Sequence, residues 1–142
     1  MVLKKILLIL LCSYFLTGNA YSGNRYGKGE LQLSSDVVSY FITYIRGGQH
    51  QYPSIFYVTQ DGTNAIYWYC PEMTNCRSGS PSQEKLQCLQ VTGQECSAFA
   101  RKRTIKWENG INPGKGKVSK INSKMTDQEI IDKLIELGFY NN

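Results

Sequence analysis

The sequence is poor in residues that enzymes use as bases and metal ligands. It contains one histidine, His50, in a turn-like stretch between Gly47 and Pro53. A catalytic histidine needs a nucleophile or an orienting acid beside it, and no motif supplies either, so we interpret His50 as a solvated loop residue. The acidic residues are scattered, and no pair of them is marked as a general acid and base. The sequence therefore predicts no catalytic residue, no metal site and no cofactor.

Long apolar segments are also missing. The longest apolar run, residues 6–16, has about eleven residues, whereas a helix that spans a membrane needs about twenty. Lys4 and Lys5 precede this run and the small residues 18–20 follow it, which is the pattern of a secretory signal peptide. We therefore expect residues 1–20 to be removed. The remaining chain is expected to be exported, periplasmic or extracellular, and not to span a membrane.

Export changes the number of cysteines available for cross-linking. Cys12 lies in the apolar run and leaves with it; it could anchor a lipid, but Leu11 stands where a lipoprotein signal has a small residue. An even number of cysteines in an exported chain indicates disulfides. Zinc is the alternative, although five and seven residues separate the members of the two near pairs, where zinc sites usually have about two to four. The four remaining cysteines are Cys70, Cys76, Cys88 and Cys96.

Local signals predict a small α+β domain in the order helix, hairpin, helix, strand or strands. A serine cap, apolar residues at helical spacing and two closing glycines indicate the first helix. Turn residues 60–64 separate two β-branched and aromatic segments, and Ser80, Pro81 and Gln83 mark the start of the second helix. The expected elements are helix 36–45, strands 54–59 and 65–70, helix 81–91, and short strands 96–101 and 104–107.

The predicted elements favour one of the three possible disulfide pairings. If the second hairpin strand, the second helix and the next strand form a right-handed crossover between parallel strands, Cys70 and Cys96 lie a strand length apart. Cys88 belongs to the last turns of the helix and Cys96 begins the following strand, so their Cα atoms can approach within the roughly 4 to 7 Å that a disulfide requires. We therefore predict the pairs Cys70–Cys76 and Cys88–Cys96.

Aromatic residues concentrate on the predicted strands. Strand 65–70 carries large side chains on both faces, which favours a position inside the sheet rather than at its edge. Tyr67, Tyr69 and Trp107 could form a row on an open sheet face and bind glycan or peptide, or they could belong to the core.

Basic residues gather near the end of the chain. Residues 101–124 contain eight Lys and Arg residues and one acidic residue, and three of the basic residues, Arg101, Lys102 and Arg103, fall at the predicted bend. In an exported protein such a patch points to envelope polyanions rather than nucleic acid, and a solvated charged surface is the alternative.

The sequence predicts that the mature chain consists of a disulfide-bonded domain followed by a C-terminal extension. We expect a flexible leader at 21–29, the disulfide-stapled domain at 30–109, a basic linker at 110–124 and a C-terminal helix within 125–142. Thr126 to Glu129 form a capping box. A helix of about eleven residues is marginal alone, so it must dock on its own domain or on a partner.

Two parts of the chain resemble known bacterial sequences. The string Tyr69-Cys70-Pro71, followed by Cys76 and then by Cys88 and Cys96, resembles a group of short exported bacterial proteins of unknown function with a YCP-x4-C pattern. Residues 129–140 are similar to short C-terminal helical segments appended to otherwise unrelated bacterial proteins, and to one helix of small peptidoglycan-binding repeats. These resemblances imply an exported bacterial protein and carry no enzymatic activity.

Together these features predict a non-enzymatic binding or interaction module of the cell envelope. Its partner would be another protein or an envelope polymer, and the sequence does not specify the oligomeric state. A small hydrolase or other enzyme, with a site assembled only in three dimensions, is the alternative, and a structural accessory role is the third option. A cleft that gathers His50 with acidic residues would favour the enzyme, and an open aromatic or basic surface would favour the binding module.

Overall fold

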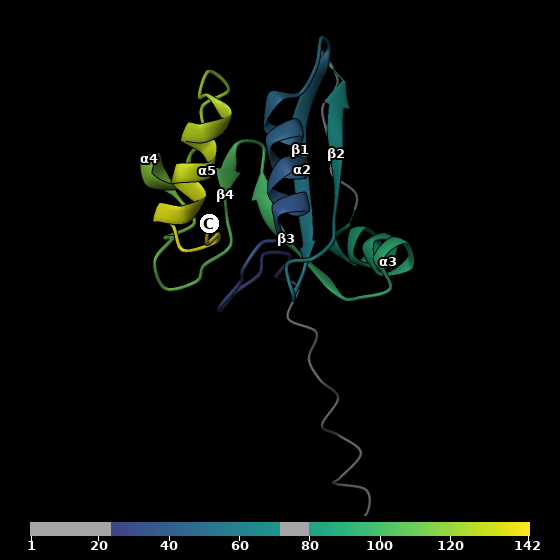
Figure 1. The fold of residues 1–142 in the computed structure, drawn as a ribbon. Helices are drawn as coiled ribbons and strands as arrows, with labels where there is room; N and C mark the ends of the chain where they lie inside the picture. The colour runs from purple at the N-terminus through teal and green to yellow at the C-terminus, as the bar shows by residue number, and fades with distance from the viewer. Residues whose placement is uncertain (1–23, 72–79) are drawn as a thin grey trace, which may run out of the picture.

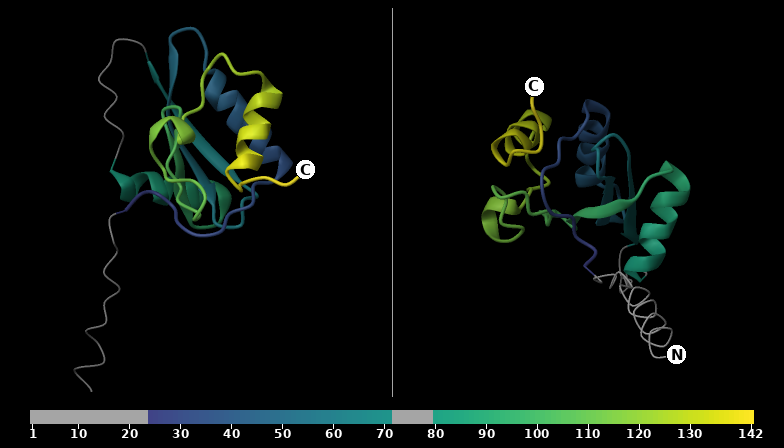
Figure 2. Two further views of the ribbon diagram at one scale, coloured as in Figure 1. Left: turned by 90° about the vertical axis from the view of Figure 1, so that its left-hand side faces the viewer. Right: turned by 90° about the horizontal axis from the view of Figure 1, so that it is seen from below.

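The computed structural model describes residues 24–71 and 80–142. A four-stranded antiparallel sheet of order β2-β1-β3-β4 has α2 and α5 on one face and α3 on the other (Figures 1 and 2). The predicted α+β class is therefore confirmed. The elements are α2 Ser35–Arg46, β1 Gln51–Thr59, β2 Ala65–Pro71, α3 Pro81–Thr92, β3 Cys96–Arg101, β4 Thr104–Ile105, α4 Gly116–Ser119 and α5 Asp127–Glu136.

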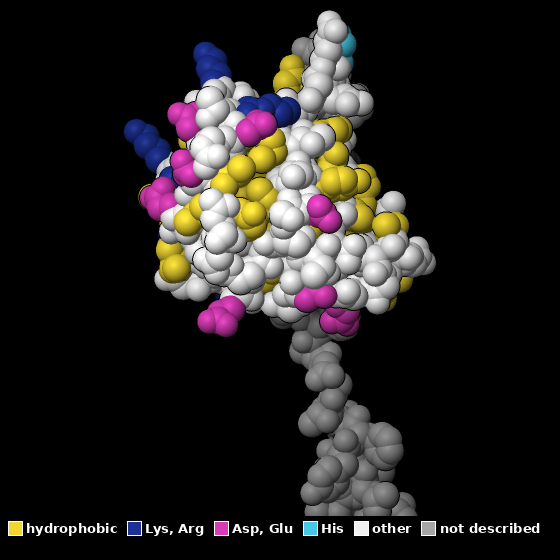
Figure 3. All heavy atoms as spheres, viewed as in Figure 1, with side chains coloured by type: hydrophobic (Ala, Val, Ile, Leu, Met, Phe, Trp, Pro, Cys, Tyr) yellow, Lys and Arg dark blue, Asp and Glu magenta, His cyan; other side chains and the backbone are white. Residues whose placement is uncertain are grey.

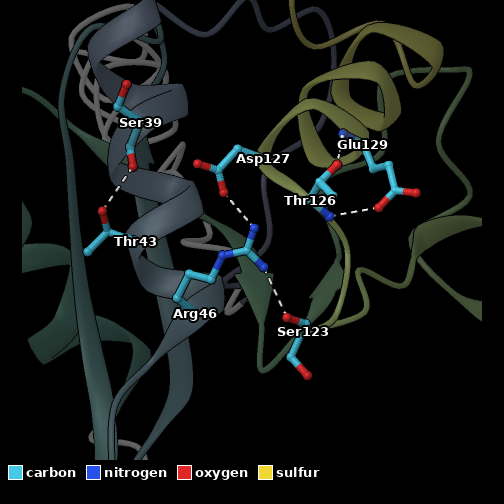
Figure 4. Close-up of polar contacts among 7 residues, drawn as sticks. All are labelled: Ser39, Thr43, Arg46, Ser123, Thr126, Asp127 and Glu129. Atoms are coloured by element: carbon cyan, nitrogen blue, oxygen red, sulfur yellow. Dashed lines mark hydrogen bonds and ion pairs between the residues drawn. The ribbon is translucent and has the colours of Figure 1, made fainter.

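Three helices begin where their capping residues predict. The Ser34 Oγ accepts a hydrogen bond from the Val37 amide at 3.3 Å, and the Ser80 Oγ accepts one from the Gln83 amide at 3.3 Å. At α5, Thr126 and Glu129 form both bonds of a capping box (Figure 4). Each cap satisfies an amide that the first helical turn leaves without a backbone partner, so these starts are encoded locally.

The strand order corrects one prediction. β1 is central and pairs antiparallel with both β2 and β3, so β2 and β3 run in the same direction with β1 between them. β2 is therefore an edge strand, not an inner one. Its side chains are large on both faces because a helix lies over each: Tyr67 and Tyr69 pack against the core under α2, whereas Ile66 and Trp68 pack against the core under α3.

The larger core lies between the sheet and the helices α2 and α5. Phe41 of α2 is fully buried, with its ring centroid 5.2 Å from that of Phe56 on β1 and 5.2 Å from that of Phe99 on β3, both edge to face. The C-terminal helix contributes Ile130 and Leu134 to the same core. The helix therefore docks on its own domain.

A smaller core lies under α3. Its buried residues are Ile55, Tyr57, Cys88, Cys96 and Ala98. The predicted disulfide Cys88–Cys96 is confirmed, with the two Cα atoms 6.1 Å apart. Cys70 is also disulfide-bonded, and its predicted partner Cys76 lies outside the described residues, as does the predicted signal peptide.

Residues 24–29, expected to belong to a loose leader, instead lie along β3. The Gly27 amide donates to the Ala98 carbonyl at 3.1 Å, and the Ala98 amide donates to the Arg25 carbonyl at 2.7 Å. A Cβ at position 27 would stand only 2.0 Å from the Trp107 ring, so glycine is required for the backbone to pass over this side chain. The segment is thus part of the folded body.

Residues 110–124, expected to be a linker, pack over β4. The buried Asn112 amide nitrogen donates to the carbonyls of Ile105 at 3.1 Å and Trp107 at 2.7 Å, while the Ser119 hydroxyl donates to Asn112 Oδ1 at 2.6 Å. The Ile121 amide donates to the Arg103 carbonyl at 2.7 Å. Because this segment satisfies backbone groups beyond β4, it closes that edge of the sheet.

Polar contacts also join α2 to the start of α5. Arg46, in the last turn of α2, forms an ion pair with Asp127 and donates to the Ser123 carbonyl at 3.0 Å (Figure 4). These contacts fix the C-terminal helix beside α2. None of the helices in the described part of the chain has the length and apolar character that membrane spanning requires.

Candidate functional site

A pocket of ≈ 310 Å³ lies beside the turn that joins β3 to β4. We call it the basic notch, because Arg101, Lys102 and Arg103 line one side of it. The opposite wall comes from the start of β1 and the end of β2, which extend past the last residue of β3. The wall residues are Tyr52, Pro53, Ser54, Ile55 and Cys70.

The notch is built on a two-residue hairpin turn. Arg101 and Thr104 are paired across β3 and β4, so Lys102 and Arg103 form the turn, and Lys102 has a φ of 51°. The Lys102 amide donates to the Ser54 carbonyl at 2.7 Å, and its carbonyl accepts from the Tyr44 hydroxyl at 2.7 Å. The backbone of the turn is therefore tied both to β1 and to α2.

Arg103 is held by the end of α2. Its Nε donates to the Ile45 carbonyl at 3.0 Å, where the last carbonyls of the helix lack intrahelical partners and favour a cation. Burial raises the pKa of Tyr44 far above its ordinary value, although the nearby Arg103 charge acts in the opposite direction. The Tyr44 hydroxyl therefore remains a donor to the turn at any physiological pH.

The positive charges of the notch are not neutralised by ion pairs within the described residues. The pairs found there join Arg25 to Glu84, Lys28 to Glu108, Arg46 to Asp127 and Lys133 to Glu136. Arg101 and Lys102 are exposed, and Arg103 is half-buried. Three cations at adjacent positions repel one another, and a bound anion relieves that repulsion.

The predicted aromatic row is not a single surface. Trp107 is fully buried and its Nε1 donates to the Gly29 carbonyl at 2.9 Å, so it belongs to the core. Tyr67 and Tyr69 are half-buried against α2, and the Tyr69 hydroxyl donates to the Thr43 carbonyl at 2.9 Å. Burial raises the pKa of Tyr69 to about 12. Neither tyrosine lines the notch.

A buried carboxylate under α3 provides a second polar feature. Glu84 is 6% exposed, accepts a hydrogen bond from the Tyr57 hydroxyl and lies 3.7 Å from the Arg25 guanidinium. Burial raises the pKa of Tyr57, and its hydrogen bond to Glu84 raises it further. Both carboxylate oxygens are thus satisfied within the protein, as a structural cluster requires.

The structure places His50 away from any cluster of metal-ligating residues. It is exposed, with a φ of 62°, in the tight turn between α2 and β1. Within residues 24–71 and 80–142, no group of three His, Cys, Asp or Glu side chains is arranged to hold a metal ion.

Sequence reasoning identified the three basic residues of the notch but missed its opposite wall. Tyr52 and Ser54 were part of a turn-like stretch and a short strand, and only the register of β1 against β2 and β3 brings them beside Arg101. No family model, curated protein or solved structure matches this chain.

Proposed function

We propose that this protein is an exported, non-enzymatic binding module whose basic notch holds the anionic groups of an envelope polymer. The observation that carries the proposal is the pocket formed by Arg101, Lys102 and Arg103 on a turn of fixed backbone, where no acidic side chain of residues 24–71 or 80–142 pairs with them. Charged donors bind phosphate or carboxylate with strong hydrogen bonds, and a fixed backbone removes the cost of ordering the turn, so that only the side chains lose freedom on binding.

The wall opposite the cations adds a different chemistry. Tyr52 is 47% exposed and Pro53 and Ile55 are apolar, so the notch offers an aromatic ring and an apolar floor beside its charges. A tyrosine ring packs against the less polar face of a sugar while cations bind an acidic substituent. An acidic polysaccharide fits this combination better than a simple inorganic anion.

The proposal is tested with the disulfide-bonded full chain, purified from an oxidising compartment. Affinity for polygalacturonate, a carboxylate polymer, and polyphosphate is measured by calorimetry. The variant carries Arg101→Ser with Lys102→Ser, both exposed positions. The matched control carries Lys115→Ser with Lys117→Ser, which removes the same charge from exposed positions outside the notch.

We expect the notch variant to lose at least about tenfold in affinity for polygalacturonate, since each charged hydrogen bond contributes about 1.5 to 3 kcal/mol before solvent screening. The control should retain most of the affinity. Equal losses in the two variants would mean that net charge alone attracts the polymer, and unchanged binding in both would refute the notch as the site.

A further inference from the structure

The two edges of the sheet differ in whether another segment of the described chain pairs with them. At the β4 edge the strand has only two residues, and residues 110–124 bond across it: Thr104 pairs with Lys120, and the Ile121 amide donates to Arg103. β2, at the other edge, has seven residues and pairs with β1 alone among the described strands. A long, uncharged edge strand is a template for pairing with another strand.

The backbone groups on the open side of β2 can be assigned from its register. The Thr59 amide donates to the Asn64 carbonyl at 2.9 Å, and the next pairs are Val58 with Ala65 and Tyr57 with Ile66. Hydrogen-bonded and non-hydrogen-bonded pairs alternate in an antiparallel ladder, so Ile66 and Trp68 direct their backbone groups toward β1. The amides and carbonyls that point outward belong to Ala65, Tyr67 and Tyr69.

We infer that a second copy of this chain pairs antiparallel with β2, so that two molecules form a dimer with one continuous eight-stranded sheet. β2 contains no charged residue, so the strand meets its own copy without repulsion, although each chain carries a net charge of +5. Hydrophobic side chains gather over α2 and β2, with no Lys or Arg over β2 in this view (Figure 3). The later part of the basic segment, around Lys120, lies at the opposite edge beside β4, whereas Arg101, Lys102 and Arg103 approach only the Cys70 end of β2.

The geometry specifies the register and the size of the assembly. All three outward-facing residues can bond across the contact when the two-fold axis passes through Tyr67. Tyr67 then faces Tyr67 of the second copy, and Ala65 faces Tyr69. Tyr40 flanks the same face, 52% exposed and with its ring centroid 5.2 Å from that of Tyr67. Because the β4 edge is closed, pairing ends at two molecules and does not continue into a fibre.

The self-pairing register is tested by charge reversal across the axis. Sedimentation velocity of the full, disulfide-bonded chain should show a dimer. Tyr67→Lys and Tyr67→Glu should each be monomeric, because like charges face each other, and an equimolar mixture of the two should restore the dimer. Tyr40→Ser, which changes a neighbouring exposed ring outside the strand, should remain dimeric. Monomeric wild type, dimeric single variants, or a mixture that stays monomeric would each overturn the inference.

Hydrogen exchange of the unmodified chain gives a second test that does not depend on a variant that folds. The amides of Tyr67 and Tyr69 should be protected at high protein concentration and exchange faster on dilution, while those of Ile66 and Trp68 stay protected throughout. Concentration-independent protection of Tyr67 would mean that the chain itself covers this edge. Fast exchange at every concentration would mean that nothing does. Either result refutes the dimer.

Discussion

The two cores on either side of the sheet differ in size: within the described residues, the core shared with α2 and α5 contains eighteen buried residues, and the core shared with α3 contains five. The contrast extends to α3 itself, which buries Glu84 and Cys88 while Leu86, Leu89 and Val91 remain exposed. The first face is held by apolar packing. The second is held by the Cys88–Cys96 disulfide and the hydrogen bond between Tyr57 and Glu84, so its stability depends on oxidation and on a buried charge.

The largest effect is expected in the core under α2. Phe41→Ala should lower the free energy of unfolding by about 3 to 5 kcal/mol, because it removes a fully buried ring and leaves a cavity between Phe56 and Phe99. Urea denaturation followed by tryptophan fluorescence measures this loss. Leu86→Ala on the exposed side of α3 is the control, and a comparable loss there would contradict the contrast between the two faces.

Removing the covalent link should weaken the face under α3 more than the other. Cys88→Ser combined with Cys96→Ser is expected to cost about 2 to 3 kcal/mol, the chain-entropy value for a short loop. Amide exchange should accelerate in α3 before α2. If the amides of α2 and α3 lose protection together, the two faces unfold as one unit. That result would contradict the view that the disulfide stabilises mainly the face under α3.

A smaller loss is expected from the buried polar cluster. Tyr57→Phe removes the hydroxyl that donates to Glu84 and should destabilise the protein by about 1 to 3 kcal/mol, since the carboxylate keeps only its contact with Arg25. The double variant Tyr57→Phe with Glu84→Met removes the buried charge as well and should recover part of this loss. Thermal or urea unfolding distinguishes the two variants; identical stabilities would argue against an unsatisfied carboxylate.

The start of α5 tests how firmly the larger face holds its last helix. Thr126→Ala removes one half of the capping box and should cost about 1 kcal/mol of stability. Thr126→Ser keeps the hydroxyl and is the matched control. Urea midpoints that do not separate the two variants would show that the cap contributes nothing once α5 is docked.

The smallest effect is expected in the dependence of stability on acidic pH. The Asp61 carboxylate accepts hydrogen bonds from the side chains of Thr59 and Thr63 and from the Thr63 amide, which lower its pKa from 3.8 to about 2. A lowered pKa stabilises the folded state above pH 3.8, and this contribution is lost as the pH falls through about 2. Wild type and Asp61→Ala should therefore converge in stability on acidification. A constant difference in urea midpoint across this range would exclude the linkage.

Features encoded in a few adjacent residues were predictable from the sequence. Capping residues predicted three helix starts because the capping bond lies within one turn: Ser34 or Ser35, of which the structure uses Ser34, and Ser80 and Thr126. The link between Cys88 and Cys96 followed because the helix end and the next strand are neighbours along the chain. The three basic residues of the notch were found for the same reason: they form one local turn.

Features that depend on distant segments were not predictable in this way. β2 appeared to be an inner strand because burial on both faces by helices leaves the same pattern as two neighbouring strands. Residues 110–124 have a linker composition, yet one buried asparagine, Asn112, satisfies two carbonyls of the sheet region. Tyr52 of the notch is brought to Arg101 only by strand register.

Hydrogen bonds join residues 32–33, near the beginning of the described chain, to residues 138–141, near its end. The Leu33 amide donates to the Phe139 carbonyl at 2.8 Å, the Gln32 side chain donates to the Gly138 carbonyl at 2.9 Å, and Asn141 donates back to Gln32 at 3.0 Å. Segments more than a hundred residues apart along the chain therefore close the same part of the hydrophobic core, which holds both Leu33 and Phe139. A change that detaches one of these segments is expected to loosen the other as well.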